Sequence, residues 1–441
     1  MKALFVFLLL ACVGFGVWSG CSLDQVTPNA PAETDVLTTA AGIRAVAVGI
    51  QGIYGETVNE TIEASAFAAK QFATMPASVL GLREIETGRN NNGLDDVQPG
   101  NGTGSNFWSG HYRVVKAAED LIKNTPNVAI ADAGTRSGIL ALARLMKAMS
   151  LGELIETYEQ IPVDVTTSQT PMFVSRDVAL NTVISLLETA RDEITVNPPS
   201  ADFNTTILGT GFDLMNTIQA MIARYALIKG DYAKALAAAN AVDLTKTSSM
   251  FYNSTTTRNP FYLNAIQLLY YKPVRTFRLN AETNDRRVAF WVTAGTGNSF
   301  LGTPVDEFAQ YRTDAAKYYV YLPGEITLIK AEAAARMGDL TTALTHVNTV
   351  RTKTTDAAGI GASLPAKTSA DLSTQAAMLD EIYIQRYYEL FITGLRLGDS
   401  RRFGKPGPEA APAVRTRTLN WFPYPDAERL SNPNTPPSPP M

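Results

Sequence analysis

The residue types that most often carry out catalysis or bind metals are scarce in this sequence. It contains two histidines, His111 and His346, and two cysteines, Cys12 and Cys21. The histidines are not spaced as zinc ligands, and no glycine-rich loop precedes a helical segment in the form that binds phosphate. The 42 acidic residues offer no spacing that singles out a pair for glycoside hydrolysis. We therefore expect no catalytic residue, no metal site and no cofactor, and predict that the protein is not an enzyme.

One polar loop, residues 88–105, could invite a calcium ion, because Asp95 and Asp96 follow a run of asparagines. The alternating oxygen ligands of a calcium-binding loop are missing. We interpret the segment as a solvated turn, and the sequence leaves open whether a structural calcium binds there.

Cys21 is the one residue whose position predicts a covalent modification. Lys2 and the apolar run after it have the layout of a secretory signal, and the run is too short to span a bilayer. The small residues Ser19 and Gly20 stand directly before Cys21, as a lipoprotein signal peptidase requires. We predict removal of residues 1–20 and lipidation of Cys21; an ordinary signal peptide with a chance cysteine is the alternative.

The cysteine count, the hydropathy and the net charge limit which partners the protein can have. Removal of the segment that contains Cys12 leaves one thiol, so a disulfide framework is excluded. Fatty chains on that thiol would hold the protein on a membrane, and no later segment is apolar enough to span one. The net charge of −4 gives no footprint for nucleic acid.

Most residues that could bind a sugar lie in the aromatic-rich segment between about 246 and 321, and two more precede the polar loop at 88–105. Stacking on a sugar needs flat aromatic faces, and planar polar side chains can bind its hydroxyl groups. If the segment around Phe290 and Trp291 is a strand, these side chains point to opposite faces, and we choose the larger indole as the platform. The alternative is that the aromatic residues form core. The predicted ligand contacts are Trp291, Phe300, Tyr311, Asn298, Phe72 and Arg83.

Helical periodicity covers most of the chain that must position these residues. Between about 246 and 321 it gives way to short alternating segments rich in aromatic residues. Trp108 falls on the helical pattern, so we assign it to packing. The predicted helices cover about 36–54, 107–124, 135–158, 176–195, 212–229, 231–242, 324–337, 339–353 and 372–395.

A repeated turn indicates how the helices are connected. Gly230-Asp231 recurs as Gly338-Asp339, and alanines precede each glycine by four and seven residues. Glycine in the left-handed conformation ends one helix, and aspartate caps the next. This resembles the turn of a tetratricopeptide repeat. We predict an all-α fold of about four tetratricopeptide-like hairpins with an irregular mixed α/β insertion.

The expected organisation has five parts. After the signal peptide, a proline-containing tether leads into the first helical region, and the aromatic-rich insertion divides that region from the C-terminal helices. The ranges are 1–20 for the signal peptide, 21–35 for the lipidated tether, 36–245 for the N-terminal helical region, 246–321 for the insertion, and 322–441 for the C-terminal helix pair, long helix and proline-rich tail.

Motifs along the chain resemble the SusD/RagB family of nutrient-uptake outer-membrane lipoproteins. The most specific stretch, 381–405, is similar to the family's pattern of glutamates, arginines and glycines, and its oppositely charged residues are expected to pair with each other and the scaffold. Ligand binding by these arginines is the less favoured interpretation. The other matching segments are Cys21-Ser22-Leu23-Asp24, Trp108 to Ala118, Leu154 to Val163, Asp285-Arg286-Arg287, Ala331-Glu332-Ala333 with Arg351, and Phe422-Pro423-Tyr424-Pro425.

The resemblance implies a function. Such proteins act as a hinged lid over a SusC-like TonB-dependent transporter in the outer membrane and capture oligosaccharides or, in some systems, peptides. It implies that the helical repeats face the barrel, that the insertion holds the cargo, and that the lipid-anchored protein faces the cell surface. The alternatives are a periplasmic-side tetratricopeptide scaffold lipoprotein and, with less support, a glycan-degrading enzyme.

Overall fold

The computed structural model describes residues 36–89 and 96–439. The predicted signal peptide, Cys21, the tether and Asp95 lie outside these residues. In the described part, helices dominate and strands occur only as short antiparallel pairs, which confirms the all-α fold with a mixed insertion. None of its helices combines the length and the hydropathy needed to cross a membrane.

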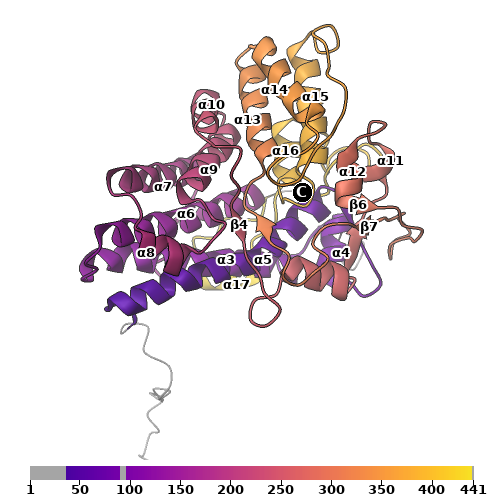
Figure 1. The fold of residues 1–441 in the computed structure, drawn as a ribbon. Coiled ribbons are helices and arrows are strands. Elements are labelled where there is room, and N and C mark those ends of the chain that lie inside the picture. Colours follow the sequence, from indigo (N-terminus) through magenta and orange to yellow (C-terminus); the bar gives the residue numbers. More distant parts are fainter. Residues whose placement is uncertain (1–35, 90–95, 440–441) are drawn as a thin grey trace, which may run out of the picture.

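Four helix pairs form the scaffold, as predicted (Figure 1). Each pair packs on the next, and the last pair stands with α15 at the top of the view. The pairs are α3 (Ala40–Ala68) with α5 (Gly102–Asn124), α6 (Ala133–Thr157) with α7 (Arg176–Val196), α9 (Leu214–Lys229) with α10 (Tyr232–Asn240), and α13 (Pro323–Arg336) with α14 (Leu340–Thr352).

Shorter helices connect and cover these pairs. They are α4 (Leu80–Thr87), η1 (Thr125–Asn127), α8 (Ala201–Phe203), η2 (Asn204–Leu208), η3 (Tyr262–Gln267), α11 (Thr276–Leu279), α12 (Arg286–Trp291), α15 (Gln375–Glu389), α16 (Arg396–Arg402) and α17 (Asp426–Ser431).

The strands lie mainly in and around the insertion. The pair β4–β8 joins the two ends of the predicted insertion, and β1–β5 ties it to the segment after α3. The pairs are β1 (Phe72–Thr74) with β5 (Tyr271–Pro273), β2 (Ile161–Pro162) with β3 (Phe173–Val174), β4 (Ser249–Met250) with β8 (Tyr318–Tyr319), and β6 (Val292–Thr293) with β7 (Glu307–Phe308).

The repeated Gly-Asp turn has the predicted geometry in both copies. Gly230 and Gly338 adopt φ angles of 91° and 88°, in the left-handed region. The Asp231 carboxylate accepts a hydrogen bond from the Lys234 amide at 3.1 Å, and Asp339 accepts one from the Thr342 amide at 3.0 Å. Both turns therefore end one helix and begin the next without leaving the first amides unpaired.

Three helix boundaries differ from the prediction. The first helix continues to Ala68 because its polar second half is buried: Asn59 donates to Glu63 at 2.7 Å and accepts from Tyr271 at 2.9 Å. Helix α4 was not predicted. The helix expected at 372–395 ends at Glu389 as α15, since Ile392 (φ 60°) and Gly394 (φ 80°) turn the backbone after it, and the separate helix α16 that follows was not predicted.

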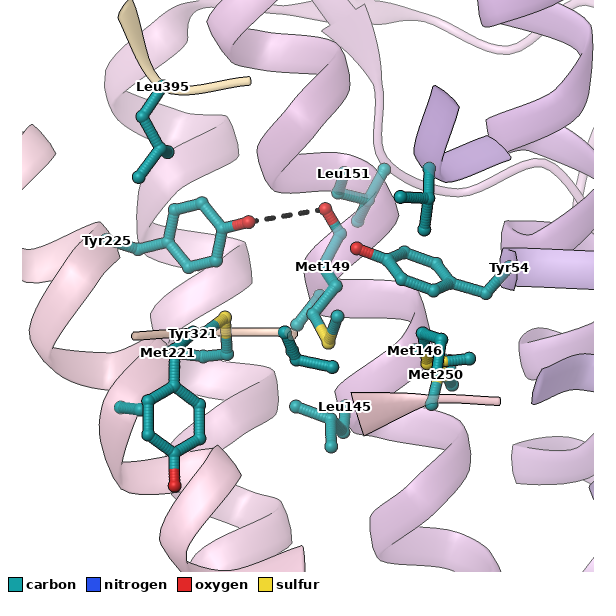
Figure 2. Packing of buried hydrophobic residues seen from close by; sticks show 14 of the residues in the cluster. Tyr54, Leu145, Met146, Met149, Leu151, Met221, Tyr225, Met250, Tyr321 and Leu395 are labelled. Carbon is teal, nitrogen blue, oxygen red and sulfur yellow. Dashed lines mark hydrogen bonds between the residues drawn. The ribbon is translucent and has the colours of Figure 1, made fainter. Parts of the chain in front are cut away.

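Helix α6 is the centre of the core (Figure 2). It is buried on almost all sides, and the rings of Tyr54 and Tyr225 approach Met149 from opposite sides. The Tyr225 hydroxyl donates to the Met149 carbonyl at 3.3 Å. A β-carbon at Gly152 would overlap the Tyr225 ring, so glycine permits this close approach of α6 and α9.

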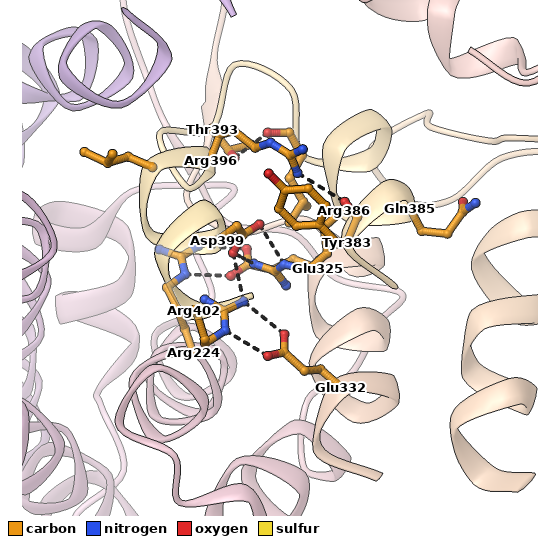
Figure 3. A network of polar contacts seen from close by, with 12 residues as sticks. Arg224, Glu325, Glu332, Tyr383, Gln385, Arg386, Thr393, Arg396, Asp399 and Arg402 are labelled. Carbon is orange, nitrogen blue, oxygen red and sulfur yellow. Dashed lines mark hydrogen bonds and ion pairs between the residues drawn. The ribbon is translucent and has the colours of Figure 1, made fainter. Parts of the chain in front are cut away.

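Buried ion pairs join the C-terminal helices to the scaffold (Figure 3). Arg386 of α15 donates to both carboxylate oxygens of Asp399 on α16, at 2.8 and 2.9 Å. Arg402 lies between Asp399 and Glu332 of α13, with contacts of 2.8 to 2.9 Å. The predicted structural role of these charged residues is therefore confirmed.

A second buried pair leaves one carboxylate poorly compensated. Arg224 donates to both oxygens of Glu325 at 2.6 and 2.8 Å, and Glu153 lies 4.0 Å from the same guanidinium. Burial raises the pKa of Glu153 to about 7; the attraction of Arg224 opposes this shift, and the charges of Glu156 and Glu325 add to it. Ionising Glu153 is consequently unfavourable in the folded protein.

The glycine at the α6–α9 contact gives the first prediction. Gly152→Ala should lower the free energy of unfolding by about 1–3 kcal/mol, because the added methyl group overpacks the core. The matched control is Gly49→Ala on α3, where an added β-carbon meets nothing within 4 Å. That variant should be neutral or more stable by up to about 1 kcal/mol. Urea unfolding measures both; equal effects would contradict the packing argument.

The Glu153 carboxyl predicts a pH-dependent stability. Its pKa is about 4.3 in an unfolded chain and about 7 in the folded protein, so stability should fall as pH rises between these values and stay low above pH 7. Glu153→Gln removes the charge and should reduce this loss by up to about 3 kcal/mol. Urea unfolding at pH 5 and pH 8 measures it, with Glu159→Gln, at an exposed carboxyl, as control. Parallel pH profiles of wild type and Glu153→Gln would contradict the assignment.

Candidate ligand-binding site

Two of the predicted ligand contacts meet at the surface. The Arg83 guanidinium of α4 lies 3.9 Å from the ring centroid of Phe300, although the two residues are far apart in the sequence. Phe300 lies in the loop between β6 and β7, residues 294–306, which we call the Phe300 loop. Its side chain is 50% exposed. The β1–β5 pair and the Phe300 amide, which donates to the Thr74 carbonyl at 2.7 Å, bring the two elements together.

The Phe300 loop is held in place by two charged side chains. Arg275 donates to the carbonyl groups of Gly295, Gly297 and Val305, each at 3.0 Å. Asp306 accepts from the Gly295 amide at 2.9 Å and from Arg278 at 2.7 and 3.0 Å. Although burial alone would raise the pKa of Asp306, these hydrogen bonds lower it. The loop is therefore preorganised.

Exposed apolar residues flank Arg83 and Phe300 along the chain. Val79 and Leu80 begin α4, and Leu80 lies one turn before Arg83; Leu301 follows Phe300. All three are about half exposed, and Asn298 is exposed in the same loop. We call Val79, Leu80, Arg83, Asn298, Phe300 and Leu301 the Phe300 patch.

The Phe300 patch offers the chemistry of a weak, general ligand contact. The buried Nε atom of Arg83 has no hydrogen-bond partner among the described residues, while one Nη atom donates to the Pro76 carbonyl at 2.9 Å. A ligand with C–H faces and hydroxyl groups could contact the ring of Phe300 and accept from this guanidinium. The Phe300 and Arg83 predictions remain untested by any bound ligand.

The choice of Trp291 as the stacking platform is wrong. Residues 286–291 form helix α12 rather than a strand, and Trp291 is its last residue. The indole is 2% exposed and donates to the Tyr388 carbonyl at 2.9 Å. It anchors the insertion to α15 and cannot stack on a ligand from solvent.

Phe72 is also core rather than a contact. It is 1% exposed and stacks on Tyr271, with ring centroids 5.2 Å apart. Four further rings contact its edges or face: Phe67, Phe261, Phe308 and Phe391. Phe72 lies in a strand whose three residues are all buried, in agreement with the alternative assignment of this ring to the core.

The two other predicted contacts have different surroundings. Tyr311 is half-buried, with its ring against Phe261 at 5.4 Å and Tyr318 at 6.0 Å. It belongs to the edge of the aromatic core of the insertion. Asn298 is exposed and forms a bridge with Pro304 across the Phe300 loop, so it remains a predicted contact.

The histidines lie in surroundings that disfavour the charged form. Burial lowers the pKa of His111 to about 3, and its Nε2 atom lies 3.0 Å from the Thr61 hydroxyl. Partial burial, with Lys330 nearby, lowers the pKa of His346. Over residues 36–89 and 96–439, no group of three or more His, Cys, Asp or Glu side chains is placed to hold a metal ion.

Two hollows away from the Phe300 patch were not predicted from the sequence. One, of about 620 Å³, lies where the end of α7, η2 and the start of α9 meet, lined by Ile194, Leu208 and Phe212 among others. The other, of about 350 Å³, separates α3 from the 54% exposed Phe251. No periodicity or composition marked these hollows; the second lies between α3 and residues 207–257, which are distant from α3 in the sequence.

Comparison with known proteins gives the fold a name. The SusD family model matches residues 298–436. A SusD superfamily protein from Bacteroides thetaiotaomicron has a TM-score of 0.68 at 16% identity, covering 90% of this chain and 99% of its own. The chain has a SusD-like fold. A comparison with curated proteins found no match.

Further structural relatives of the SusD-like chain have titles that refer to sugars. A putative sugar binding protein from Bacteroides vulgatus has a TM-score of 0.65 at 18% identity, covering 91% of this chain and 98% of its own. A SusD-like carbohydrate binding protein from the same species has a TM-score of 0.63 at 15% identity, covering 89% and 96%. The family match of the SusD-like chain includes most of the Phe300 loop, α13, α14, and the ion-pair network.

Proposed function

We propose that this SusD-like chain is an outer-membrane lipoprotein that binds a nutrient, an oligosaccharide, and delivers it unchanged to a SusC-like TonB-dependent transporter. The SusD-like fold over most of the chain is the observation that carries the proposal. The sugar- and carbohydrate-binding relatives support the cargo class. A peptide is the second cargo, which the same surface chemistry would accept.

The Phe300 patch is the proposed contact for this cargo. Sugars bind through C–H groups packed on an aromatic face and through hydroxyl groups paired with planar polar side chains. Phe300 supplies the exposed ring, and Arg83 supplies a guanidinium beside it. The anchored backbone of the Phe300 loop limits the entropy lost on binding.

The proposed role is non-catalytic. The patch contains one ionisable side chain, Arg83, and a guanidinium group neither accepts a proton nor acts as a nucleophile. Glu86 lies on the same helix α4, and it accepts from the amide and the hydroxyl of Thr74 at 2.9 and 2.6 Å. Its oxygen is thus engaged in fixing β1 to α4.

Loss of the exposed ring gives the test of cargo binding. Phe300→Ala in the full chain should weaken binding of the best oligosaccharide from a neutral panel by about 10-fold, the size expected for removal of one aromatic contact. The matched control is Phe251→Ala, which removes an equally exposed ring at another surface. Isothermal titration calorimetry measures both. Weaker binding only in Phe251→Ala would move the site to the hollow beside α3, and no binding to any glycan would reject the cargo class.

Lipidation of Cys21 gives the test of membrane attachment. The native protein should carry diacylglycerol on this thiol and fractionate with the outer membrane, since several acyl chains anchor a protein stably. Cys21→Ser should release it to a soluble fraction. Mass spectrometry of the N-terminus and membrane fractionation measure these outcomes. An unmodified Cys21 in a soluble periplasmic protein would contradict the lipoprotein assignment.

A further inference from the structure

A half-buried tryptophan lies among arginines far from the Phe300 patch in the fold. Trp421 separates two hollows, one of about 200 Å³ and one of about 380 Å³. The end of α6, the start of α7 and helix α16 form the smaller one, which is lined by Glu156, Arg176, Arg401 and Arg402 beside Trp421. We call this smaller space the Trp421 hollow.

Two guanidinium groups are held against the indole. The Arg401 guanidinium lies 3.9 Å from the Trp421 ring centroid, and that of Arg176 lies 5.2 Å from it. Backbone carbonyls fix both groups: Arg401 donates to Asn420 at 2.6 Å and to Glu156, and Arg176 donates to Ile155 at 2.5 Å. Their positions are therefore set before any ligand arrives.

Arg401 and Arg417 hydrogen-bond oxygens other than carboxylates, whereas three further arginines pair with carboxylates. Arg386, Arg402 and Arg287 each donate directly to one or more carboxylates. Among the described residues, the nearest carboxylate to Arg401 is that of Glu156, at 3.9 Å, and Arg176 already binds that group. Two positive charges thus share one negative charge, although the Arg401 side chain is only 13% exposed.

The charges around Arg401 also leave an excess of positive charge in the Trp421 hollow. Burial lowers the pKa of Arg401 to about 9; Glu156 opposes this shift, and the positive charges of Arg176, Arg417 and Arg402 add to it. Arg402 is itself balanced by Glu332 and Asp399. The excess in the Trp421 hollow is consequently about one positive charge, from Arg176 and Arg401 against Glu156.

We propose that the Trp421 hollow binds a small ring-shaped ligand with one carboxylate, an acidic sugar of the uronic acid class. A single carboxylate supplies the missing charge, and planar guanidinium groups bind it with directed hydrogen bonds. The accessible part of the indole provides an apolar contact for the ring. The hollow is smaller than the roughly 300–1,000 Å³ of drug-sized sites, so it fits one ring rather than an oligosaccharide.

The site goes beyond the proposed function and does not rest on it. Glucuronate and glucose form the matched probe pair, because they differ in the carboxylate. Titration of the full chain, monitored by tryptophan fluorescence at constant ionic strength, should show saturable quenching with glucuronate and at least 10-fold weaker binding of glucose. Trp108 and Trp291 are buried, so Trp421→Phe should abolish the signal change. Phe300→Ala should leave glucuronate binding unchanged, which separates the two sites.

Two variants that change the charge of the Trp421 hollow should change glucuronate affinity in opposite directions. Arg176→Gln frees Glu156 to neutralise Arg401 and should weaken glucuronate binding by at least 10-fold, whereas Glu156→Gln enlarges the positive excess and should tighten it severalfold. Arg191→Gln, at a partly exposed arginine on the same helix α7, is the matched control and should change nothing. Calorimetry measures affinity directly where fluorescence is altered.

Several outcomes would overturn the proposal. Equal affinities for glucose and glucuronate would remove the role of the carboxylate. Tighter binding of inorganic phosphate than of glucuronate would make the hollow a phosphate site. Should Arg176→Gln lower the melting temperature, Arg176→Lys keeps the charge but loses the fork, and unchanged glucuronate affinity in that folded variant would reject guanidinium recognition.

Discussion

A guanidinium group that leaves water loses its hydration, and this loss costs several kcal/mol unless acceptors in the protein replace the water. The chain buries several such groups where its C-terminal helices meet the scaffold. Arg287, for example, is fully buried between Asp285 and Glu389, and Arg224 is paired with Glu325. Each pair needs both partners at once, so α13, α15 and α16 can dock in only one arrangement. The exposed surfaces proposed to bind ligands depend on this arrangement.

The aromatic residues of the insertion serve mainly as core. Phe72, Phe261, Tyr271 and Phe308 contact one another through edges and faces, and the irregular backbone around them has few long strands or helices to bury. Aromatic rings supply a large apolar area for each residue, which suits a segment of short elements. Abundance of aromatic residues in such a segment is therefore poor guidance to a ligand site, and exposure of a ring such as Phe300 is the better criterion.

Local rules predicted the scaffold from the sequence, because helix periodicity and the Gly-Asp turns depend on neighbours in the chain. The caps formed by Asp231 and Asp339 confirm this. The second half of α3 was missed since its polar residues are buried by elements distant in the sequence, such as the insertion, where Tyr271 binds Asn59. The site was predicted in part: Arg83 and Phe300 meet through a long-range strand pairing that no local pattern encodes, while the assumption of a strand at Trp291 failed because a short helix forms there.

The strand pair β4–β8 sets Ser249 opposite Tyr319 and Met250 opposite Tyr318. The segment between β4 and β8 therefore leaves the helical hairpins and returns to them at neighbouring positions. The length and sequence of its loops can change without altering the distance between the two ends of the segment. Its exposed loops have this freedom, whereas the contacts of Arg287 and Trp291 with α15 tie the rest of the segment to the fold.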